Sequence, residues 1–475
     1  MRIPPIMKFA SLCTLYLALV LLPLLFSLAQ GLPRRPWLDE LSSGLAMVAF
    51  AMLLMEFLLS GRYRALSKGV GMDLTMRFHQ MIALAVVAFL LLHPMLYSLP
   101  YGAPRPGDTE RLLTVTLTPM ATISGVLAWT LLFGMVTMAF FRKEFRYETW
   151  RLAHGLMALA IAVLGAHHAI DTGRYAQAGA MRMFWVVAVG LAVAALVHAY
   201  LVKPWLQGRR SYRVVDVAKE SERTWRLVLE PASRYVLRHE AGQFVWLKFF
   251  KSFGRISEHP FSIASPPALL PRIEFLIKES GDFTNTIGSI PVGTSAYVDG
   301  PYGNFAVHGR KGEGVMLIAG GVGIAPIIGI ARDLAAFGRK VPMRLVYADR
   351  SPARFAAQSE IAELVRSGAI EARYVAAEPP PEWSGLRGVL DAENLKACLP
   401  ETGAESWLYL VCGPPGMIDA VELNLSKLGV PLTQIVSERF QYDSGVLTPR
   451  ERLIRAGIAG LVVAQIVAVL VFALS

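Results

Sequence analysis

The chain has 475 residues and a net charge of +11, and 54% of its residues are hydrophobic while only 17% are charged. With a mean hydropathy of +0.44, this composition excludes a wholly soluble protein. The three cysteines, Cys13, Cys398 and Cys412, have no close spacing, which excludes a disulfide framework and an iron–sulfur cluster.

Apolar segments dominate the first 203 residues, and one more closes the chain. Each has roughly 20 residues with few or no charges, which is enough to span a bilayer. These segments lie near 9–31, 42–60, 79–99, 114–141, 152–170, 183–202 and 453–474. We therefore predict a membrane α-helical bundle over 1–203, made of six helices, plus an extra transmembrane helix over 453–474. The first segment lacks a cleavage site for a signal peptide and is predicted to be retained.

Basic residues gather in every second loop between these segments. Arg62, Arg142 and Lys203 each belong to such a cluster. The positive-inside rule then predicts a cytoplasmic N-terminus and a cytoplasmic 203–450 region, in a bacterial inner membrane. The net positive charge is explained by this topology and by contact with anionic membrane lipid, rather than by nucleic-acid binding.

Two of the apolar segments carry histidines with the same spacing. His79 and His93 stand at positions i and i+14 in the third segment, and His154 and His168 repeat this spacing in the fifth. Over 14 residues an α-helix rises about 21 Å and rotates by about 40° less than four full turns. The two histidines of each segment therefore lie on the same helix face but at two different depths. Imidazole is a standard haem-iron ligand. We predict two stacked haem b groups, one between His79 and His154 and one between His93 and His168.

Other polar residues in these segments have simpler interpretations. His167 remains the alternative ligand at the second depth, although it points about 140° away from His154 on an ideal helix. His198 has no partner at the spacing of the other pairs and is predicted to be structural. Glu56, near the end of the second segment, is predicted to extend its carboxylate toward the membrane surface.

The remaining sequence predicts two folded domains. Residues 211–309 contain short strand patterns separated by turn residues, which indicates a small antiparallel β-barrel. These strands are expected at 212–217, 225–230, 244–250, 272–279 and 295–300. Residues 312–440 alternate strand and helix patterns, which is typical of an α/β nucleotide-binding domain. Its first strand, glycine turn and helix (314–337) would hold a pyrophosphate at the helix start.

Four motifs in this half stand in a recognisable order and spacing. They are HPFSIAS at 259–265, GPYGNF at 300–305, GGVGIAP at 320–326 and CGPPGM at 412–417. Together they resemble the flavin and nicotinamide domains of the ferredoxin-NADP reductase type. Joined to six spans with paired histidines on the third and fifth, they make the chain resemble the NADPH oxidase and ferric reductase superfamily.

The resemblance implies the residues of two cofactor sites. FAD would be bound by residues of the barrel domain, namely His259, Pro260, Phe261, Ser262, Ser265, Thr284, Gly300 and Gly303. The nicotinamide nucleotide would be bound by Gly320, Gly321, Gly323, Pro326, Gly413 and Pro414. Three residues would lie at the reacting rings: Ser262 near the flavin N5 edge, Cys412 beside the nicotinamide, and Phe440 over the flavin.

The end of the second α/β strand bears on the choice of nicotinamide nucleotide. Arg350 could grip the 2′-phosphate of NADPH, because a guanidinium matches phosphate oxygens. Asp349 could instead bond the free 2′-hydroxyl of NADH. We favour NADPH at this stage, with Arg350 as the main determinant and NADH as the alternative.

The implied function is an NAD(P)H-dependent transmembrane oxidoreductase. Electrons would pass from cytoplasmic NAD(P)H through FAD and the two haems to an extracytoplasmic acceptor. The acceptor would be an Fe(III) chelate or O2, as in a ferric reductase or a superoxide-producing oxidase. A membrane subunit that feeds electrons to a periplasmic protein partner is the alternative, and the nicotinamide site argues against a non-enzymatic haem sensor.

Overall fold

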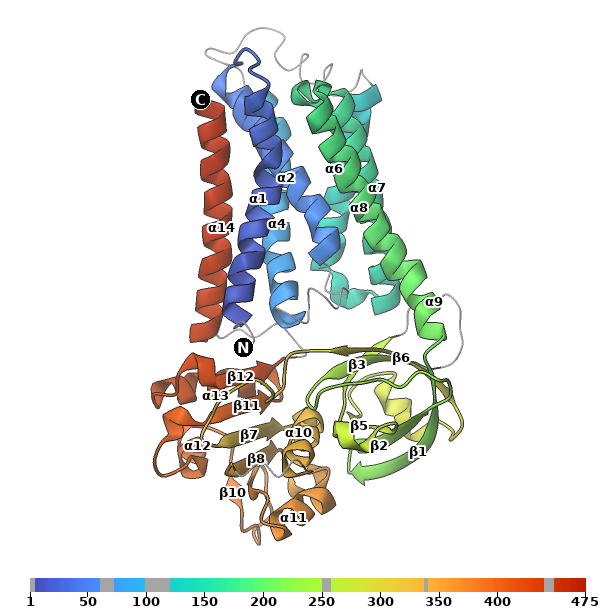
Figure 1. Ribbon diagram of the computed structural model, residues 1–475, viewed down its shortest axis with the longest axis vertical. Coiled ribbons are helices and arrows are strands. Elements are labelled where there is room, and N and C mark those ends of the chain that lie inside the picture. Colours follow the sequence, from blue (N-terminus) through green and yellow to red (C-terminus); the bar gives the residue numbers. More distant parts are fainter. Residues whose placement is uncertain (1–4, 60–71, 99–119, 250–257, 337–340, 440–447) are drawn as a thin grey trace. The chain divides into compact units, whose positions relative to one another are not determined.

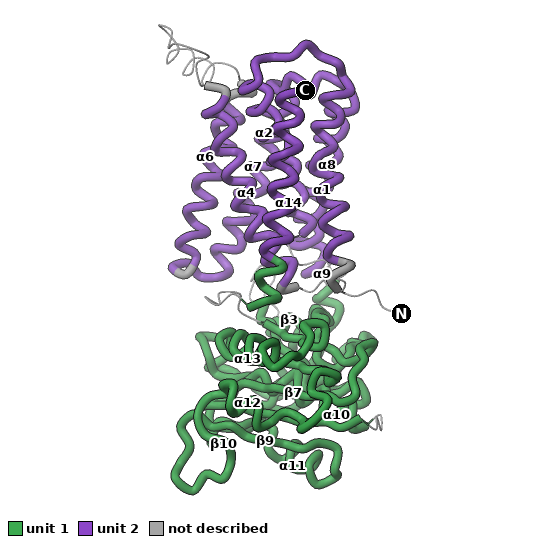
Figure 2. Tube along the Cα trace, turned by 90° about the vertical axis from the view of Figure 1, so that its left-hand side faces the viewer, with its two compact units in different colours: residues 1–2, 71–73, 205–454 green, residues 3–70, 74–204, 455–475 purple. Residues whose placement is uncertain are grey.

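The computed structural model describes residues 5–59, 72–98, 120–249, 258–336, 341–439 and 448–475. The chain divides into two compact units (Figure 2). The helical unit comprises residues 3–70, 74–204 and 455–475, and the sheet unit comprises residues 205–454 together with 1–2 and 71–73. Each unit is described by itself below.

Seven helices of the described residues are long and apolar enough to cross a membrane (Figure 1). They are α1 (Pro5–Ala29), α2 (Trp37–Leu59), α4 (Met72–Ser98), α6 (Met120–Phe140), α7 (Tyr147–Asp171), α8 (Gly179–Val197) and α14 (Pro449–Leu474). The seven predicted segments form these helices, although residues 114–119 of the fourth segment lie outside the described residues. After α8 the chain makes a π-helical turn, His198–Val202, and the short helix α9 (Lys203–Gly208).

Backbone packing in the helical unit is uneven. The closely packed pairs are α6 with α7, α1 with α2, α2 with α8, and α7 with α8. Within the described residues, α4 is not among these close pairs although it belongs to the same bundle. Helix α14 packs against α2 at Gly44, where an added Cβ would lie 3.0 Å from both Val469 and Phe472. The C-terminal helix is therefore an integral part of the bundle.

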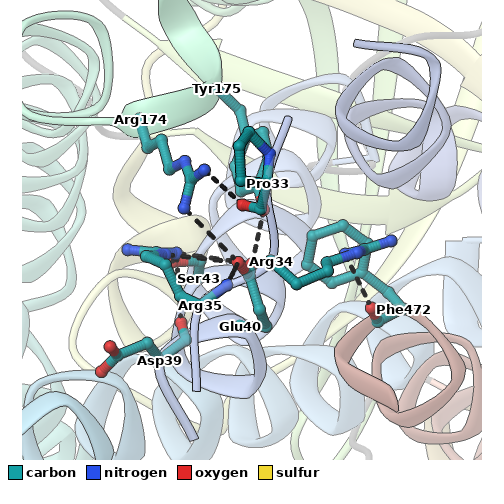
Figure 3. A network of polar contacts seen from close by, with 9 residues as sticks. All are labelled: Pro33, Arg34, Arg35, Asp39, Glu40, Ser43, Arg174, Tyr175 and Phe472. Atoms are coloured by element: carbon teal, nitrogen blue, oxygen red, sulfur yellow. Dashed lines mark hydrogen bonds and ion pairs between the residues drawn. The ribbon is translucent and has the colours of Figure 1, made fainter. Parts of the chain in front are cut away.

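A polar network fixes one end of the helical unit (Figure 3). Glu40 is fully buried there and accepts hydrogen bonds from Arg35 Nε at 3.3 Å and from the Tyr175 hydroxyl at 2.5 Å. Arg174 bonds the Pro33 carbonyl. Arg34 bonds the Phe472 carbonyl at 3.2 Å. These contacts tie α2, the segment before it and the end of α14 together, and charge pairing accounts for the buried carboxylate.

The first domain of the sheet unit is a curled antiparallel sheet. Its strands are β1 (Ser211–Ser221), β2 (Thr224–Pro231), β3 (Phe244–Phe249), β4 (His259–Ser262), β5 (Ile273–Lys278) and β6 (Ser295–Tyr302). They are ordered β4-β3-β6-β1-β2-β5, and an antiparallel bridge between Ile263 and Phe275 joins the two edges. The five predicted strands are present. The sixth, β4, is the HPFS segment that the sequence indicated only as a ligand contact.

The second domain is a six-stranded parallel sheet with helices packed on it. Its elements are β7 (Val315–Gly320), α10 (Ile324–Ala336), β8 (Met343–Asp349), α11 (Gln358–Arg366), β9 (Glu371–Ala376), β10 (Leu386–Arg387), α12 (Ala392–Cys398), β11 (Leu408–Cys412), α13 (Pro415–Lys427) and β12 (Ile435–Glu438). The strand order is β10-β9-β8-β7-β11-β12. In β7, Leu317 and Met316 point to opposite faces and join two separate hydrophobic cores. The predicted fold class, a helical bundle with a β-barrel and an α/β domain, is confirmed.

Candidate functional site: two histidine levels and two nucleotide turns

The first pair of predicted haem ligands faces across the helical unit. His79 on α4 and His154 on α7 have ring centres 6.5 Å apart, with their planes inclined by 79°. The Nδ1 atom of His79 lies 2.6 Å from Glu56 Oε2 on α2. The ring of His154 stacks on Trp150, one helical turn earlier, with ring centres 5.3 Å apart. Both imidazoles are thus oriented by neighbouring side chains.

The second pair also comes together. His93 on α4 and His168 on α7 are near enough for the charge of one ring to act on the other. The Nδ1 atom of His93 lies 2.8 Å from Ser42 Oγ and 3.0 Å from the Ser42 carbonyl oxygen. The ring of His168 packs directly on Gly125 of α6, where an added Cβ would lie 2.6 Å from its Nδ1 atom. Glycine at this position makes room for the imidazole.

His167 has other partners. Its Nδ1 atom lies 3.0 Å from Ser124 Oγ and its Nε2 atom 3.3 Å from Asp171 Oδ2. Its side chain is 46% exposed. The ring nitrogens of His167 are therefore both occupied by contacts within the chain, which agrees with the choice of His168 from helix phase.

The histidine levels fit bis-imidazole haem. Metal–imidazole bonds are about 2 Å long, so two rings that share one iron have centres about 6 Å apart, close to the separation of His79 and His154. The buried Nδ1 atom of His154 has no hydrogen-bond partner among the described residues. In helix α7, which is described throughout, only Ile161, Ala162 and Ala166 are buried, although α6 and α8 pack against this helix. Membrane lipid together with an apolar macrocycle beside α7 would cover the rest.

The prediction for Glu56 is wrong. Its side chain is only 8% exposed, and its carboxylate contacts His79 instead of extending toward the membrane surface. The signal that could have found this role is the spacing within α2, because Ser42 and Glu56 also stand at positions i and i+14. Burying a charged group in a membrane helix requires a partner, and here the partner is an imidazole.

Strand β4 carries the residues implied to bind the flavin. His259, Pro260, Phe261 and Ser262 pair with Leu247, Trp246, Val245 and Phe244 of β3, respectively. The ring of His259 stacks on Phe283, with centres 3.9 Å apart and planes inclined by 3°. Ser262 is buried. The strand pairing fixes the backbone of this segment, so alternate side chains face opposite sides of the barrel wall.

The other implied flavin contacts lie in turns of the barrel domain. Thr284 Oγ1 accepts hydrogen bonds from the backbone N–H groups of Ser280 and Gly281, at 2.9 and 3.0 Å. Ser265 Oγ accepts from the Glu274 N–H at 3.0 Å, which ties it to β5. These hydroxyls shape the backbone that a ligand would meet.

Gly300 and Gly303, near the end of the barrel domain, occupy positions where a larger residue would clash or be strained. An added Cβ at Gly300 would lie 2.5 Å from Val245. Gly303 has a φ of +95°, a conformation that favours glycine. Its nearest neighbours include Phe244 and the Glu438 carboxylate. Phe440, the residue expected to cover the flavin, lies outside the described residues.

The two glycine turns of the α/β domain pack directly on each other. An added Cβ at Gly323 would lie 2.1 Å from the Cys412 carbonyl oxygen, and one at Gly320 would lie 2.3 Å from Met417 Sδ. The Cα atom of Gly320 is also only 3.0 Å from the position of a Cβ at Gly413. Pro326 is buried in the first turn of α10. Close turn-to-turn packing thus explains most of these glycines.

Gly321 differs from its neighbours because it faces charged groups. Its φ is +54°, and an added Cβ would lie 3.4 Å from Lys278 Nζ and 3.6 Å from Asp349 Oδ2. Lys278, at the end of β5, was not singled out from the sequence, because only the fold brings the barrel domain to this turn. A lysine, backbone N–H groups and a helix start suit a pyrophosphate.

Replacing Gly323 with alanine should weaken nicotinamide-nucleotide binding while FAD is retained. The new methyl group would overlap the Cys412 carbonyl, and such overpacking costs about 1–3 kcal/mol. We expect KM for the nucleotide to rise at least about fivefold. Steady-state kinetics and flavin content measure the two effects. Gly416→Ala is the control, since that Cβ meets nothing within 4 Å; equal effects of both variants would refute the packing argument.

Cys412 lies at the centre of these turns as a neutral thiol. Burial, reinforced by the Glu438 carboxylate, raises the pKa of Cys412 well above its usual value. Glu438 is the residue directly beside Cys412 in the parallel pairing of β11 and β12. Glu438 was not predicted as a site residue, yet its carboxylate lies between Cys412 and Gly303.

Asp349 and Arg350, the two residues predicted to determine the choice of nicotinamide nucleotide, make different contacts. One oxygen of Asp349 accepts a hydrogen bond from the Arg350 backbone N–H at 2.6 Å, and the other faces the Gly321 turn. The Arg350 guanidinium pairs with Glu378 at 2.9 Å on the surface. The carboxylate, rather than the guanidinium, is therefore held at the glycine turn.

Three known domain families match the chain. The ferric reductase like transmembrane component matches residues 45–165, the FAD-binding domain residues 211–306 and the oxidoreductase NAD-binding domain residues 317–423. The fold and site thus define a membrane protein with flavin- and nicotinamide-nucleotide-binding domains. In this order, the three domains give the chain the architecture of the NADPH oxidase and ferric reductase superfamily.

Curated relatives resemble part of the chain. NADH-cytochrome b5 reductase 1 of Laccaria bicolor is 32% identical over 35% of this chain and 56% of its own length. The reductase component of propane 2-monooxygenase of Mycolicibacterium goodii is 31% identical over 39% of this chain and 56% of its own length. The chain thus spans little more than half the length of these relatives. The cytochrome b5 reductase domain of Ulva prolifera nitrate reductase is 19% identical over 48% of this chain and 96% of that domain, with a TM-score of 0.43.

Proposed function

We propose that the chain is a transmembrane NAD(P)H oxidoreductase that carries electrons through FAD and two bis-histidine haem b groups to an acceptor on the other face of the membrane. The observation that carries the proposal is the facing of His79 with His154, with His93 and His168 each 14 residues further along the same two helices, in a chain that also has flavin and nicotinamide domains. No other arrangement of its described histidines offers two ligand pairs at two depths.

The chemistry balances as two one-electron transfers for each nucleotide oxidised. NAD(P)H gives up a hydride and becomes NAD(P)+; the two electrons of the hydride reduce two Fe(III) centres to Fe(II) or two O2 molecules to superoxide, and its proton is released to water. FAD supplies the conversion between two-electron and one-electron transfer. Haem iron supplies one-electron carriers inside the apolar bundle. The protein contributes the β4 strand, the Thr284 turn and the glycine turns that hold the nucleotides in fixed orientations.

We place the sheet unit and the N-terminus in the cytoplasm of a bacterial cell. Helices α1 to α8 alternate in direction, so the segment between α6 and α7 and the segment after α8 lie on one face of the bundle. Both are basic, through Arg142 and Arg146 in the first and Arg209 and Arg210 in the second, and such faces meet the cytoplasm and anionic lipid headgroups. His79 and His154 lie at the depth nearest that face.

The acceptor is a small one-electron oxidant, either an Fe(III) chelate or O2. Supply of electrons to a periplasmic protein is the second candidate, for which the extra helix α14 could provide a docking element. That helix packs against Gly44, and its Phe472 carbonyl accepts a hydrogen bond from Arg34 (Figure 3). It is therefore a part of the bundle and not a free docking element. This packing favours direct reduction of a small acceptor.

The test is haem content and acceptor use on one purified sample. Pyridine haemochrome analysis should give about two haems for each chain, because there are two ligand pairs. Oxygen consumption, superoxide formation and ferric-chelate reduction, each driven by NAD(P)H, should identify the acceptor. A preparation with FAD but no haem would overturn the proposal.

We propose NADH as the preferred nucleotide, in place of the NADPH preference inferred from the sequence. Asp349 is held beside the Gly321 turn while Arg350 pairs with Glu378. Named relatives are NADH-cytochrome b5 reductases. An acidic residue in this position bonds the ribose 2′-hydroxyl and repels a 2′-phosphate.

Replacing Asp349 with alanine should therefore reverse the nucleotide preference. Loss of a hydrogen bond to a charged group costs about 1.5–3 kcal/mol, so kcat/KM for NADH should fall at least about tenfold while that for NADPH rises. Arg350→Ala is the matched control and should change neither value appreciably. A selective loss of NADPH use in Arg350→Ala would instead support the original assignment.

A further inference from the structure

Helix α2 supplies a polar partner to each histidine of α4. Ser42 and Glu56 stand at positions i and i+14 on α2, the same spacing that separates His79 from His93 on α4. Glu56, late in α2, meets His79, which is early in α4, whereas Ser42 meets His93. The two helices are thus antiparallel at these contacts, and their equal spacing brings one partner to each histidine level.

Both partners select the same form of the imidazole. A carboxylate oxygen and a backbone carbonyl can only accept hydrogen bonds, so the Nδ1 atoms of His79 and His93 must carry the hydrogen. Each Nε2 atom then keeps its lone pair for a metal. The Ser42 hydroxyl donates to the His93 carbonyl at 2.8 Å, which leaves its oxygen able to accept from Nδ1 as well.

The two partners differ in charge. At His79 the acceptor is a carboxylate at 2.6 Å, and at His93 the acceptors are a neutral hydroxyl and a neutral carbonyl. A carboxylate that accepts from the outer nitrogen of a metal-bound histidine makes the imidazole a stronger electron donor. A stronger donor stabilises the oxidised iron and lowers its reduction potential.

We propose that Glu56 and Ser42 are positioning residues that give the two haem levels different reduction potentials, with the lower potential at His79 and His154. This inference rests on the proposed function, since it requires the two haems. Electrons would then move downhill from the His79 level to the His93 level. Helix α2, which supplies no haem ligand, would thus set the direction of electron transfer.

The environment of Glu56 strengthens its effect. The carboxylate is buried, and its other oxygen lies 3.5 Å from the Tyr16 hydroxyl. Tyr16 in turn packs edge-on against Phe78, with ring centres 5.0 Å apart. In surroundings of low polarity a charged hydrogen bond acts more strongly than in water.

The experiment is a redox titration of the haems in the full-length holoprotein at fixed pH. Wild type should show two one-electron steps. Glu56→Gln keeps the shape and an acceptor oxygen but removes the charge, so the lower midpoint potential should rise and the other should stay. We expect at least a tenfold change in the reduction equilibrium of that haem, which is about 59 mV for a one-electron couple.

Two control variants locate the effect. Tyr16→Phe leaves the contact between Glu56 and His79 intact and should keep both midpoints. Ser42→Ala removes a neutral partner at the other level and should leave the lower midpoint unchanged. If Glu56→Gln moves neither midpoint, or moves both equally, with two haems retained, the inference fails while the proposed function stands. Absence of haem from wild type would instead refute the proposed function.

A second measurement needs no variant. Redox-difference infrared spectra of the wild-type holoprotein report the hydrogen bond at the outer nitrogen of each haem-bound histidine. The ligand band of the low-potential haem should be shifted toward that of an imidazolate, and the band of the other haem should not. Identical ligand bands in the two redox steps would overturn the inference even if Glu56→Gln loses its haem.

Discussion

If the proposed function holds, replacing His168 with alanine should remove one of the two haems and stop electron delivery to the far face of the membrane. His168 is the proposed partner of His93 at the second level, and its ring occupies the space that Gly125 leaves open. Without this imidazole the second proposed haem would lack one of its two protein ligands, and the proposed electron route would end at the His79 level. We expect acceptor reduction to fall at least about 100-fold, the upper range seen for damaged metal sites.

Reduction of the flavin by NADH should be unaffected by the replacement of His168. Stopped-flow measurements should show reduction of the flavin by NADH at the wild-type rate, because no residue of the sheet unit is altered. The matched control is His167→Ala, whose ring contacts Ser124 and Asp171. Retention of two haems in His168→Ala, together with their loss in His167→Ala, would reverse the ligand assignment.

Replacing Arg439 with methionine should strongly destabilise the sheet unit. Its guanidinium is buried and pairs with Asp419 at 2.5 Å and with Glu422 at 3.0 Å. Both carboxylates are also buried. Methionine fills much of the space but leaves two uncompensated charges, and breaking a buried pair in this way costs about 3–5 kcal/mol. The residue follows β12 directly, so the end of this strand would lose its anchor.

Thermal unfolding of the full chain in detergent, followed by flavin release, measures this loss. A destabilisation of that size should lower Tm by roughly 10 °C for a unit of this length. Arg366→Met is the control, because its pair with Glu363 is exposed and exposed pairs contribute at most about 1 kcal/mol. An unchanged Tm for Arg439→Met would show that the buried network does not stabilise the unit.

The sequence was most informative where a regular spacing coincides with residues suited to one chemical task. His93 follows His79 at the same spacing at which His168 follows His154, and helix geometry alone then brings each pair to one face. In the structure the rings of His79 and His154 lie 6.5 Å apart, and the assignment of both pairs as haem ligands stays a prediction. Short strand patterns bounded by turn residues likewise predicted the sheets, as in the continuous apolar run Val315–Gly320.

The sequence was least informative where a role depends on a contact between distant segments. A carboxylate in an apolar helix has the same sequence signature whether it reaches the surface or a buried histidine, which is why Glu56 was misinterpreted. The glycines at 320 and 323 are predicted to meet a ligand, and the structure adds close contacts with Met417 and the Cys412 carbonyl that the sequence does not reveal. Lys278 and Glu438 join the site only through tertiary packing, which no local pattern reports.

The most direct test of the central claim is electron transfer across a sealed membrane. The full chain is reconstituted in vesicles with a membrane-impermeant ferric chelate trapped inside, and NADH is added outside to reach those molecules whose sheet unit faces outward. The account predicts reduction of the trapped chelate, with loss of the signal in His168→Ala and its retention in His167→Ala. NADH oxidation that reduces an acceptor on the outer face while the trapped chelate stays oxidised would contradict the account.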